Sequence, residues 1–220
     1  CGGELLYDED EETNLPTDSE VLKTVNYTVG ITRMFRSLSN QEFVSYDGGN
    51  AIVLNASVYY TLFNAFFDGD AMTVGEGFAV DDIIAHEWAH GYTVSTSNLQ
   101  YTTLSGAMNE AMSDIFGESY DLLNTNEPTQ PLGAFLRSTT PECTAYSWNF
   151  RSLDPGTDES HRWLYGEEIT QTSNPSGLYA IRDMYAPQCF GHPDTTDSSN
   201  FVCDDSDNGG VHTNSGVINR

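Results

Sequence analysis

With 220 residues, 38% of them hydrophobic and 12% aromatic, the chain is long enough to bury a core, and its composition excludes an intrinsically disordered protein. Asp and Glu number 33 against 8 Lys and Arg, so the net charge of −25 disfavours binding to nucleic acid or to anionic membranes. No apolar run approaches the length of a membrane span, and the sequence shows no charged-then-apolar leader pattern; because it begins at Cys1 and not at Met, we expect a removed leader or a fragment.

The first half of the chain predicts a helix followed by strands and turns. Apolar residues recur at helical spacing over 19–38, directly after a capping sequence at Thr17–Ser19. Alternating and clustered apolar residues over 51–63 predict strand structure. The Asp and Gly residues at 68–71 and 75–77 then predict the turns of a hairpin or loop.

The second half is expected to be mainly helical. Helices are predicted over about 81–97 and about 105–123. A stretch rich in Pro, Thr, Asn and Gly over 124–160 is interpreted as an ordered loop insertion. Short helical pieces alternate with turns over 161–220, notably at 181–187. The expected fold class is therefore α+β.

Four residues on the two central helices have the spacing of a metal site. His86 and His90 are one helical turn apart, so both imidazoles face the same way. Glu110, on the next helix, would complete a set of two His and one Glu, which suits zinc with one open position. Glu87 lies beside the histidines but points elsewhere, which suits a residue that acts on water instead of on the metal.

Two further polar residues flank Glu110. Asp114 is four residues beyond it and can accept the second ring N–H of a ligating histidine, and Asn109 directly precedes it. The alternative reading is a buried pair of helix histidines without a metal. That reading leaves acidic residues facing a core helix unexplained.

Several motifs in the same order resemble the thermolysin family of zinc metallopeptidases. They are the His-Glu-Trp-Ala-His sequence at 86–90, Asn109–Glu110 with Asp114, Asn64–Phe67, Tyr101 eleven residues past His90, and Asp207–His212. The resemblance implies a secreted zinc endopeptidase. Such an enzyme would hold one Zn²⁺ ion through His86, His90 and Glu110 and would hydrolyse peptide bonds with a metal-activated water.

The resemblance also implies a two-lobed architecture with the active site in the cleft between the lobes. Residues 1–95 would be the latter part of a β-rich N-terminal domain that includes the zinc-binding helix. Residues 96–220 would be the first part of a mainly helical C-terminal domain. Both ends are expected to be truncated relative to the family.

Four residues receive catalytic roles from the resemblance. Glu87 would take the proton of the attacking water and pass it to the leaving nitrogen. Tyr101 and His212 would donate hydrogen bonds to the oxyanion, and Asp207 would orient the His212 imidazole. Taken singly, Tyr101 fits a packed aromatic residue equally well, and His212 fits an ordinary loop histidine.

Substrate-binding residues also follow from the resemblance. Arg182 would hold the substrate carbonyl beyond the scissile bond, with Arg151 as a competing candidate and a surface salt bridge as the alternative role. Asn64 and Ala65 would pair with an extended peptide by strand addition.

Two isoleucines complete the substrate site that the resemblance implies. Ile83 and Ile181 would line a pocket for a bulky hydrophobic residue after the scissile bond. Core packing explains either isoleucine equally well.

Calcium is the second metal that the resemblance implies. Asp82, Asp121 and Glu167 match acidic positions of the family's structural calcium site, and carboxylates from separate segments suit Ca²⁺. The alternative is a set of plain solvated carboxylates.

Cysteines and sequons favour an extracellular setting. The four cysteines follow no zinc spacing, and Cys189 and Cys203 bracket a loop that a disulfide would suit, which leaves Cys1 with Cys143. Asn26 and Asn55 begin N-glycosylation sequons. We therefore expect a secreted glycoprotein.

The expected partner is a peptide or protein substrate, bound by a monomer. Two alternatives to an endopeptidase remain. One is a non-catalytic zinc- or calcium-binding module, which would have no need of Glu87. The other is an exopeptidase, for which the sequence shows no motif that would bind a free peptide terminus.

Overall fold

The computed structural model describes residues 16–40, 42–43, 46, 55–60, 63–124, 163–166, 169 and 181–220. Four predictions lie outside this part of the chain: the loop over 125–160, the pairing of Cys1 with Cys143, the role of Arg151 and the role of Glu167. The elements are α1 (Ser19–Leu38), β1 (Asn55–Tyr60), β2 (Ala65–Phe67), β3 (Ala71–Gly75), α2 (Asp81–Ser95), α3 (Thr103–Asn124), β4 (Leu164–Tyr165), β5 (Arg182–Asp183), η2 (Pro187–Phe190), α4 (Asp207–Asn214) and α5 (Gly216–Asn219).

Helix α1 covers the predicted range of 19–38. It begins after Asp18, whose carboxylate accepts hydrogen bonds from the backbone N–H groups of Glu20 at 3.0 Å and Val21 at 3.2 Å. These bonds satisfy two of the N–H groups that lack partners at a helix start. The apolar face of α1, including Ile31 and Phe35, is buried in the core.

The strands form a mixed sheet in the order β1-β3-β2. Strand β3 pairs parallel with β1 and antiparallel with β2, so β2 lies at an edge. The turn between β2 and β3 is the one predicted at 68–71. Its Asp68 carboxylate accepts from the backbone N–H groups of Asp70 and Ala71, an Asx turn that also lowers the pKa of Asp68.

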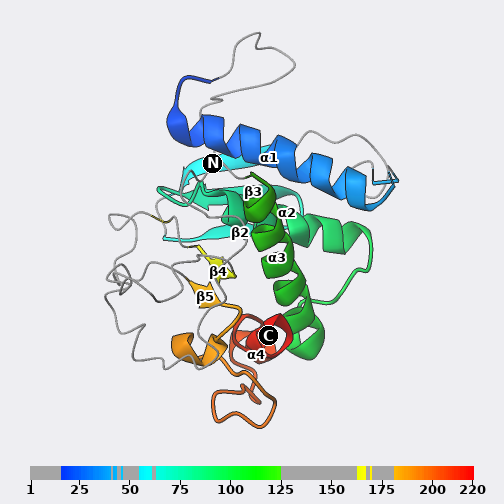
Figure 1. The fold of residues 1–220 in the computed structure, drawn as a ribbon, viewed down its shortest axis with the longest axis vertical. Helices are drawn as coiled ribbons and strands as arrows, with labels where there is room; N and C mark the ends of the chain where they lie inside the picture. Colours follow the sequence, from blue (N-terminus) through cyan, green and yellow to red (C-terminus); the bar gives the residue numbers. More distant parts are fainter. Residues whose placement is uncertain are drawn as a thin grey trace, which may run out of the picture.

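Helix α2 is the centre of the molecule. Most of its residues are buried, including Ile83, Ile84 and Trp88, so it is surrounded by protein on nearly all sides. The Trp88 indole N–H donates to the Thr28 hydroxyl at 2.8 Å and joins α2 to α1. In Figure 1, α1 lies across one end of the molecule, with the sheet, α2 and α3 beneath it.

Helices α2 and α3 pack closely. A Cβ atom placed on Gly117 of α3 would lie 2.7 Å from the Asp82 carbonyl oxygen of α2, so only glycine fits this contact. Helix α4 packs at the other end of α3, where a Cβ on Gly106 would lie 2.4 Å from Val211. The two helices expected to carry the site are therefore held at a fixed, short separation.

The segment at 181–187 corrects a prediction. Arg182–Asp183 is a strand and not part of a helical piece, because it pairs antiparallel with Leu164–Tyr165. The Asp183 carboxylate then accepts from the backbone N–H groups of Tyr185 and Ala186 and turns the chain towards η2. Cys203 is a free, exposed cysteine in this structure, and the side chain of Cys189, its predicted partner, lies outside the described part of the chain.

Candidate metal centre

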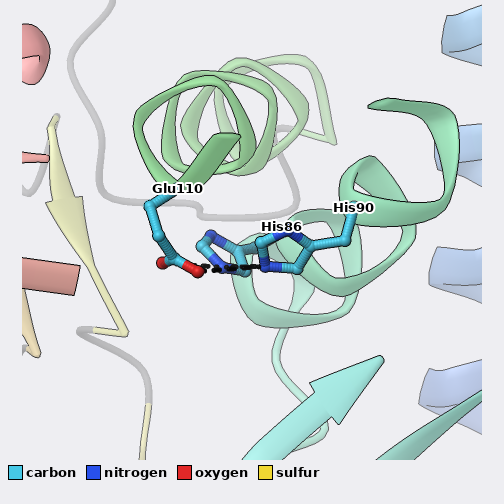
Figure 2. A group of neighbouring side chains, drawn as sticks. All are labelled: His86, His90 and Glu110. Carbon is cyan, nitrogen blue, oxygen red and sulfur yellow. Dashed lines mark hydrogen bonds and ion pairs between the residues drawn. The ribbon is translucent and has the colours of Figure 1, made fainter. Parts of the chain in front are cut away.

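Helix α2 brings two histidines to one point. His86 and His90 are one turn apart, and their Nε2 atoms lie 3.0 Å from each other. Figure 2 shows both rings directed towards Glu110, which reaches them from the neighbouring helix α3. The histidine spacing therefore converges as the sequence predicted.

Glu110 closes the triangle of candidate ligands. Its Oε2 lies 3.6 Å from His86 Nε2, and its Oε1 lies 3.4 Å from His90 Nε2. Four ligands placed 2.0–2.1 Å from zinc in a tetrahedron would lie about 3.3 Å from one another, which is close to these separations, each histidine having its own near oxygen of Glu110. Glu110 Oε2 is also buried without a hydrogen-bond partner. Within the described part of the chain, this is the one group of His, Cys, Asp or Glu residues that could hold a metal ion.

The second nitrogen of each histidine faces a polar group. His90 Nδ1 lies 2.8 Å from Asn109 Oδ1 and 3.2 Å from the Ser113 hydroxyl. His86 Nδ1 lies 2.9 Å from Asp114 Oδ1, in poor alignment for a hydrogen bond. Such contacts orient the rings with Nε2 towards a metal. Asn109 and Asp114 thus lie where the sequence predicted, and Ser113 is an addition.

Asp114 also holds a buried arginine. Arg182 of β5 donates to both Asp114 oxygens, from Nε at 2.8 Å and from Nη2, and its guanidinium lies 4.3 Å from the Tyr165 ring centroid. Asn219 adds a third donor at 2.8 Å. Burial by itself would raise the pKa of Asp114, but Arg182 and His86 outweigh burial and lower it. Asp114 is therefore ionised, and Arg182 is bound to it.

Glu87 is buried next to the candidate ligands, with 5% of its surface exposed. Burial raises its pKa to about 7, with His90 opposing and Glu110 adding to the shift. A carboxyl group with a pKa near neutrality can both accept and release a proton. For Glu110, burial again favours the neutral form, but His86, His90 and Arg182 reverse this and lower its pKa.

Tyr101 and His212 meet on the exposed side of Glu110. The Tyr101 hydroxyl donates to Glu110 Oε1 and lies 2.9 Å from His212 Nε2. Asp207 binds His212 twice, through Nδ1 at 2.6 Å and through the backbone N–H at 2.9 Å. Three residues that are distant from the histidine motif in sequence therefore gather beside it.

The remaining predicted residues lie further out. Asn64 is exposed, Ala65 is half-buried and begins the edge strand β2, and Ile181 is packed against the core. Ile83 is 1% exposed and belongs to the core cluster. Glu118 is a buried carboxyl group that the sequence reading missed, although its position one turn past Asp114 on the same helix could have indicated it.

Asp82 and Asp121, two of the three carboxylates predicted to bind calcium, are buried with Glu118. We call Asp82, Glu118 and Asp121 the acid cluster. Glu118 accepts from the Trp163 backbone N–H at 2.7 Å, and Asp82 accepts from that of Gly166. Burial and the neighbouring acids raise the pKa of Asp82 to about 8 and that of Glu118 well above its ordinary value. Asp82, Glu118 and Asp121 do not by themselves form a metal-binding group of described residues, and Glu167, the third predicted calcium ligand, lies outside that part of the chain.

No helix in the described part of the chain has the length and apolar character needed to cross a membrane.

Comparison with known proteins gives consistent matches. The family model described as "Thermolysin metallopeptidase, alpha-helical domain" matches residues 97–220. A bacillolysin of Brevibacillus brevis is 31% identical in an alignment that covers 99% of this chain and 34% of the relative.

Two further matches differ in what they show. A zinc metalloproteinase of Renibacterium salmoninarum is 36% identical, over 71% of this chain and 23% of the relative. The precursor of protealysin, a metalloproteinase from Serratia proteamaculans, has a similar structure with a TM-score of 0.68 and 24% sequence identity. That match covers 100% of this chain and 62% of the other, and it shows a shared fold.

Proposed function

Because this chain belongs to the thermolysin family of metallopeptidases, we propose that it provides the catalytic centre of a secreted, zinc-dependent endopeptidase. The chain spans about a third of the length of the bacillolysin that it matches. The activity proposed is hydrolysis of internal peptide bonds, with a preference for a hydrophobic residue after the scissile bond.

One observation carries the proposal. Three ligand atoms from two helices converge at the spacing that zinc requires, and a buried carboxyl group with a pKa near neutrality lies beside them. A zinc ion held by His86, His90 and Glu110 would acidify a water molecule and polarise the substrate carbonyl. A metal site without catalytic activity would have no chemical need for Glu87.

The protein's own groups would then move the protons and stabilise charge. Glu87 accepts a proton from the attacking water and delivers it to the leaving amide nitrogen. Tyr101 and His212 donate hydrogen bonds to the oxygen that becomes negatively charged. Asp207 would accept a hydrogen bond from His212 Nδ1 and stabilise the imidazolium form, in which Nε2 also carries a proton for donation.

The proposed substrate-binding residues are supported by fewer contacts than the metal ligands and the catalytic residues are. Ala65 begins an edge strand, which supports pairing of β2 with an extended peptide. Arg182 has its Nη2 atom 3.8 Å from Glu110 Oε2, which supports a place beside the reacting carbonyl. Ile181 and Ile83 are retained as candidates for the hydrophobic pocket.

We further propose the wider organisation that the sequence predicted. Residues 1–95 and 96–220 would belong to two lobes of a monomer, and the start of the matched family model at residue 97 supports this boundary. A calcium ion at Asp82, Asp121 and Glu167 and glycosylation at Asn26 and Asn55 complete the proposal. Asn26 is exposed on α1, which supports access to its side chain.

Four variants and one substrate test the function. The wild type, given an end-blocked peptide, should cleave it internally, lose activity with a chelator and contain about one zinc per chain. His90→Ala should lose both zinc and activity. Glu87→Gln should retain zinc but lose activity by about a thousandfold, within the range expected when a residue of the catalytic machinery is removed.

Two controls make the result specific. Glu76→Gln changes an exposed turn carboxylate and should match the wild type. Asp82→Asn should keep zinc and activity but lower the protection that added Ca²⁺ gives against heat. A wild-type chain that binds zinc but cuts no peptide would instead support a non-catalytic module, and cleavage restricted to peptides with free ends would support an exopeptidase.

A further inference from the structure

Two strained turns pack against each other beside the candidate active site. In the first, Thr103 has a φ of 49°, a value that is rare for a β-branched residue. In the second, the residues from Asp207 to Gly210 all have positive φ, at 52°, 51°, 85° and 80°. Thr103, Asp207 and Asn208 are not glycines, so their positive φ values cost free energy, and contacts with other segments must stabilise both turns.

The two turns support each other directly. The Thr102 hydroxyl donates to the Asn208 carbonyl oxygen at 3.2 Å, across 106 residues of sequence. A Cβ atom on Gly209 would lie 2.7 Å from Thr103 Cγ2 and 3.1 Å from Thr103 Cα. The backbone at Gly209 therefore rests on Thr103, and no larger residue fits there without displacing one turn.

Each turn carries one of the two proposed oxyanion donors. Tyr101 directly precedes Thr102, and His212 follows Gly210 after one residue. Both side chains are substantially exposed, at 40% for the Tyr101 residue and 50% for the His212 side chain, so surrounding packing does little to fix them. Tyr101 is held by its bond to Glu110 and His212 by its bond to Asp207, and their 2.9 Å contact further requires that the two backbones stay in register.

We propose that Thr102 and Thr103 are positioning residues that lock the turn before α3 to the left-handed turn of Asp207–Gly210, so that Tyr101 and His212 act as one preset pair. This inference rests on the proposed peptidase function. It assigns no contact with substrate to either threonine. Their effect is to fix two donors in advance at the point where negative charge develops.

The first test removes a hydrogen bond without changing shape. Thr102→Val should lower kcat by about fivefold with KM changed less than about twofold, as expected for the loss of an interaction that matters in the transition state. Thr102→Ser keeps the hydroxyl and should restore kcat. Zinc content should be the same in all three proteins.

The second test uses two glycines with similar backbone angles. Gly209 and Gly191 have φ of 85° and 77°, but a Cβ on Gly191 would meet nothing within 4 Å. Gly191→Ala therefore measures only the cost of placing alanine at a positive φ. Gly209→Ala measures the same cost together with the steric clash with Thr103. The second change should lower kcat about tenfold more than the first. Adding Thr103→Ser to Gly209→Ala removes Cγ2 and should recover part of the loss.

A readout on the metal-free protein separates this inference from the peptidase proposal. The ¹⁵N resonance of the His212 imidazole should move in Thr102→Val and return in Thr102→Ser, because Nε2 loses and regains its contact with Tyr101. If the wild type cleaves no peptide but this pattern appears, the function fails and the positioning role stands. An unchanged resonance together with an unchanged kcat in Thr102→Val would overturn the positioning role.

Discussion

Helices α2 and α3 bury two polar clusters where they pack together, and the pKa values of the carboxyl groups shift in opposite directions in the two clusters. At the first, which we call the metal cluster (His86, His90, Glu110 and Asp114), the carboxyl groups have lowered pKa values. At the acid cluster of Asp82, Glu118 and Asp121, the pKa values of Asp82 and Glu118 are raised. The two clusters share the same helices.

Burial cannot explain the contrast, because Glu110 and Glu118 are both 0% exposed. The neighbours explain it. Glu110 faces two imidazoles and Arg182, whereas Glu118 faces Asp82 and Asp121 and accepts only a backbone N–H. A buried carboxyl group thus stays charged where cationic groups surround it and keeps its proton where other acids do.

The largest effect is expected when the metal cluster loses a charge. Asp114→Asn leaves Arg182 buried without its bidentate partner and should destabilise the protein by about 3–5 kcal/mol. It should also weaken zinc binding by about 10–100-fold, because Asp114 faces the second nitrogen of His86. Urea unfolding and zinc titration measure the two effects. Unchanged stability would show that Arg182 does not need Asp114.

The acid cluster should make stability depend on pH in the metal-free protein. Asp82 keeps its proton up to about pH 8 when folded, whereas the unfolded group loses it near pH 4. The folded state therefore binds more protons between these values. Stability should fall as pH rises, by up to about 1.4 kcal/mol per pH unit for each such group.

Asp82→Asn isolates that contribution and should flatten the decline. The comparison is made as a difference between two proteins because other groups titrate in the same range. The pKa of His192, for instance, is lowered to about 4, mainly by burial, so His192 makes stability rise between about pH 4 and 6.5. Parallel stability curves for wild type and Asp82→Asn would show that Asp82 is ionised in both states.

A smaller effect is expected from Asn219, the third donor to Asp114. Asn219→Ala removes the 2.8 Å bond but leaves the arginine pair intact. It should cost about 1 kcal/mol, the ordinary net value of one hydrogen bond. Thermal unfolding of the single variant beside Asp114→Asn measures the difference, and a loss as large as that of Asp114→Asn would show that Asn219 is the main partner.

The smallest effect is expected from Glu118→Gln, which is the matched control for Asp114→Asn. Burial and the neighbouring acids raise the pKa of Glu118 and so favour its uncharged form, which an amide replaces closely. The free energy of unfolding should change by less than about 1 kcal/mol at pH 7. A loss comparable to that of Asp114→Asn would mean that the acid cluster is ionised.

The sequence predicted the metal cluster well because its geometry is local. The helical period alone places His86 and His90 on one face, and the spacing of Glu110 and Asp114 repeats that period on a second helix. The bounds of α1 were predicted for the same reason, from apolar spacing and the capping residue Asp18. The thermolysin-like fold followed from motif order.

The features that the sequence did not reveal depend on distant pairing. Arg182–Asp183 is a strand only because Leu164–Tyr165 lies beside it. The burial of Glu118 and the contact of Asn219 with Asp114 likewise require segments more than 40 residues apart. The positive φ values of Asp207 and Asn208 also accompany the packing of their turn on Thr102 and Thr103, more than 100 residues away.

Gly117 lies where helices α2 and α3 approach each other closely. Its missing side chain lets α3 approach the Asp82 carbonyl of α2, in the region between the two clusters. A single methyl group there would wedge the helix axes apart and carry Glu110 away from both imidazoles. The separation between Glu110 and the two histidines, the candidate metal ligands, therefore depends on a glycine seven positions further along α3.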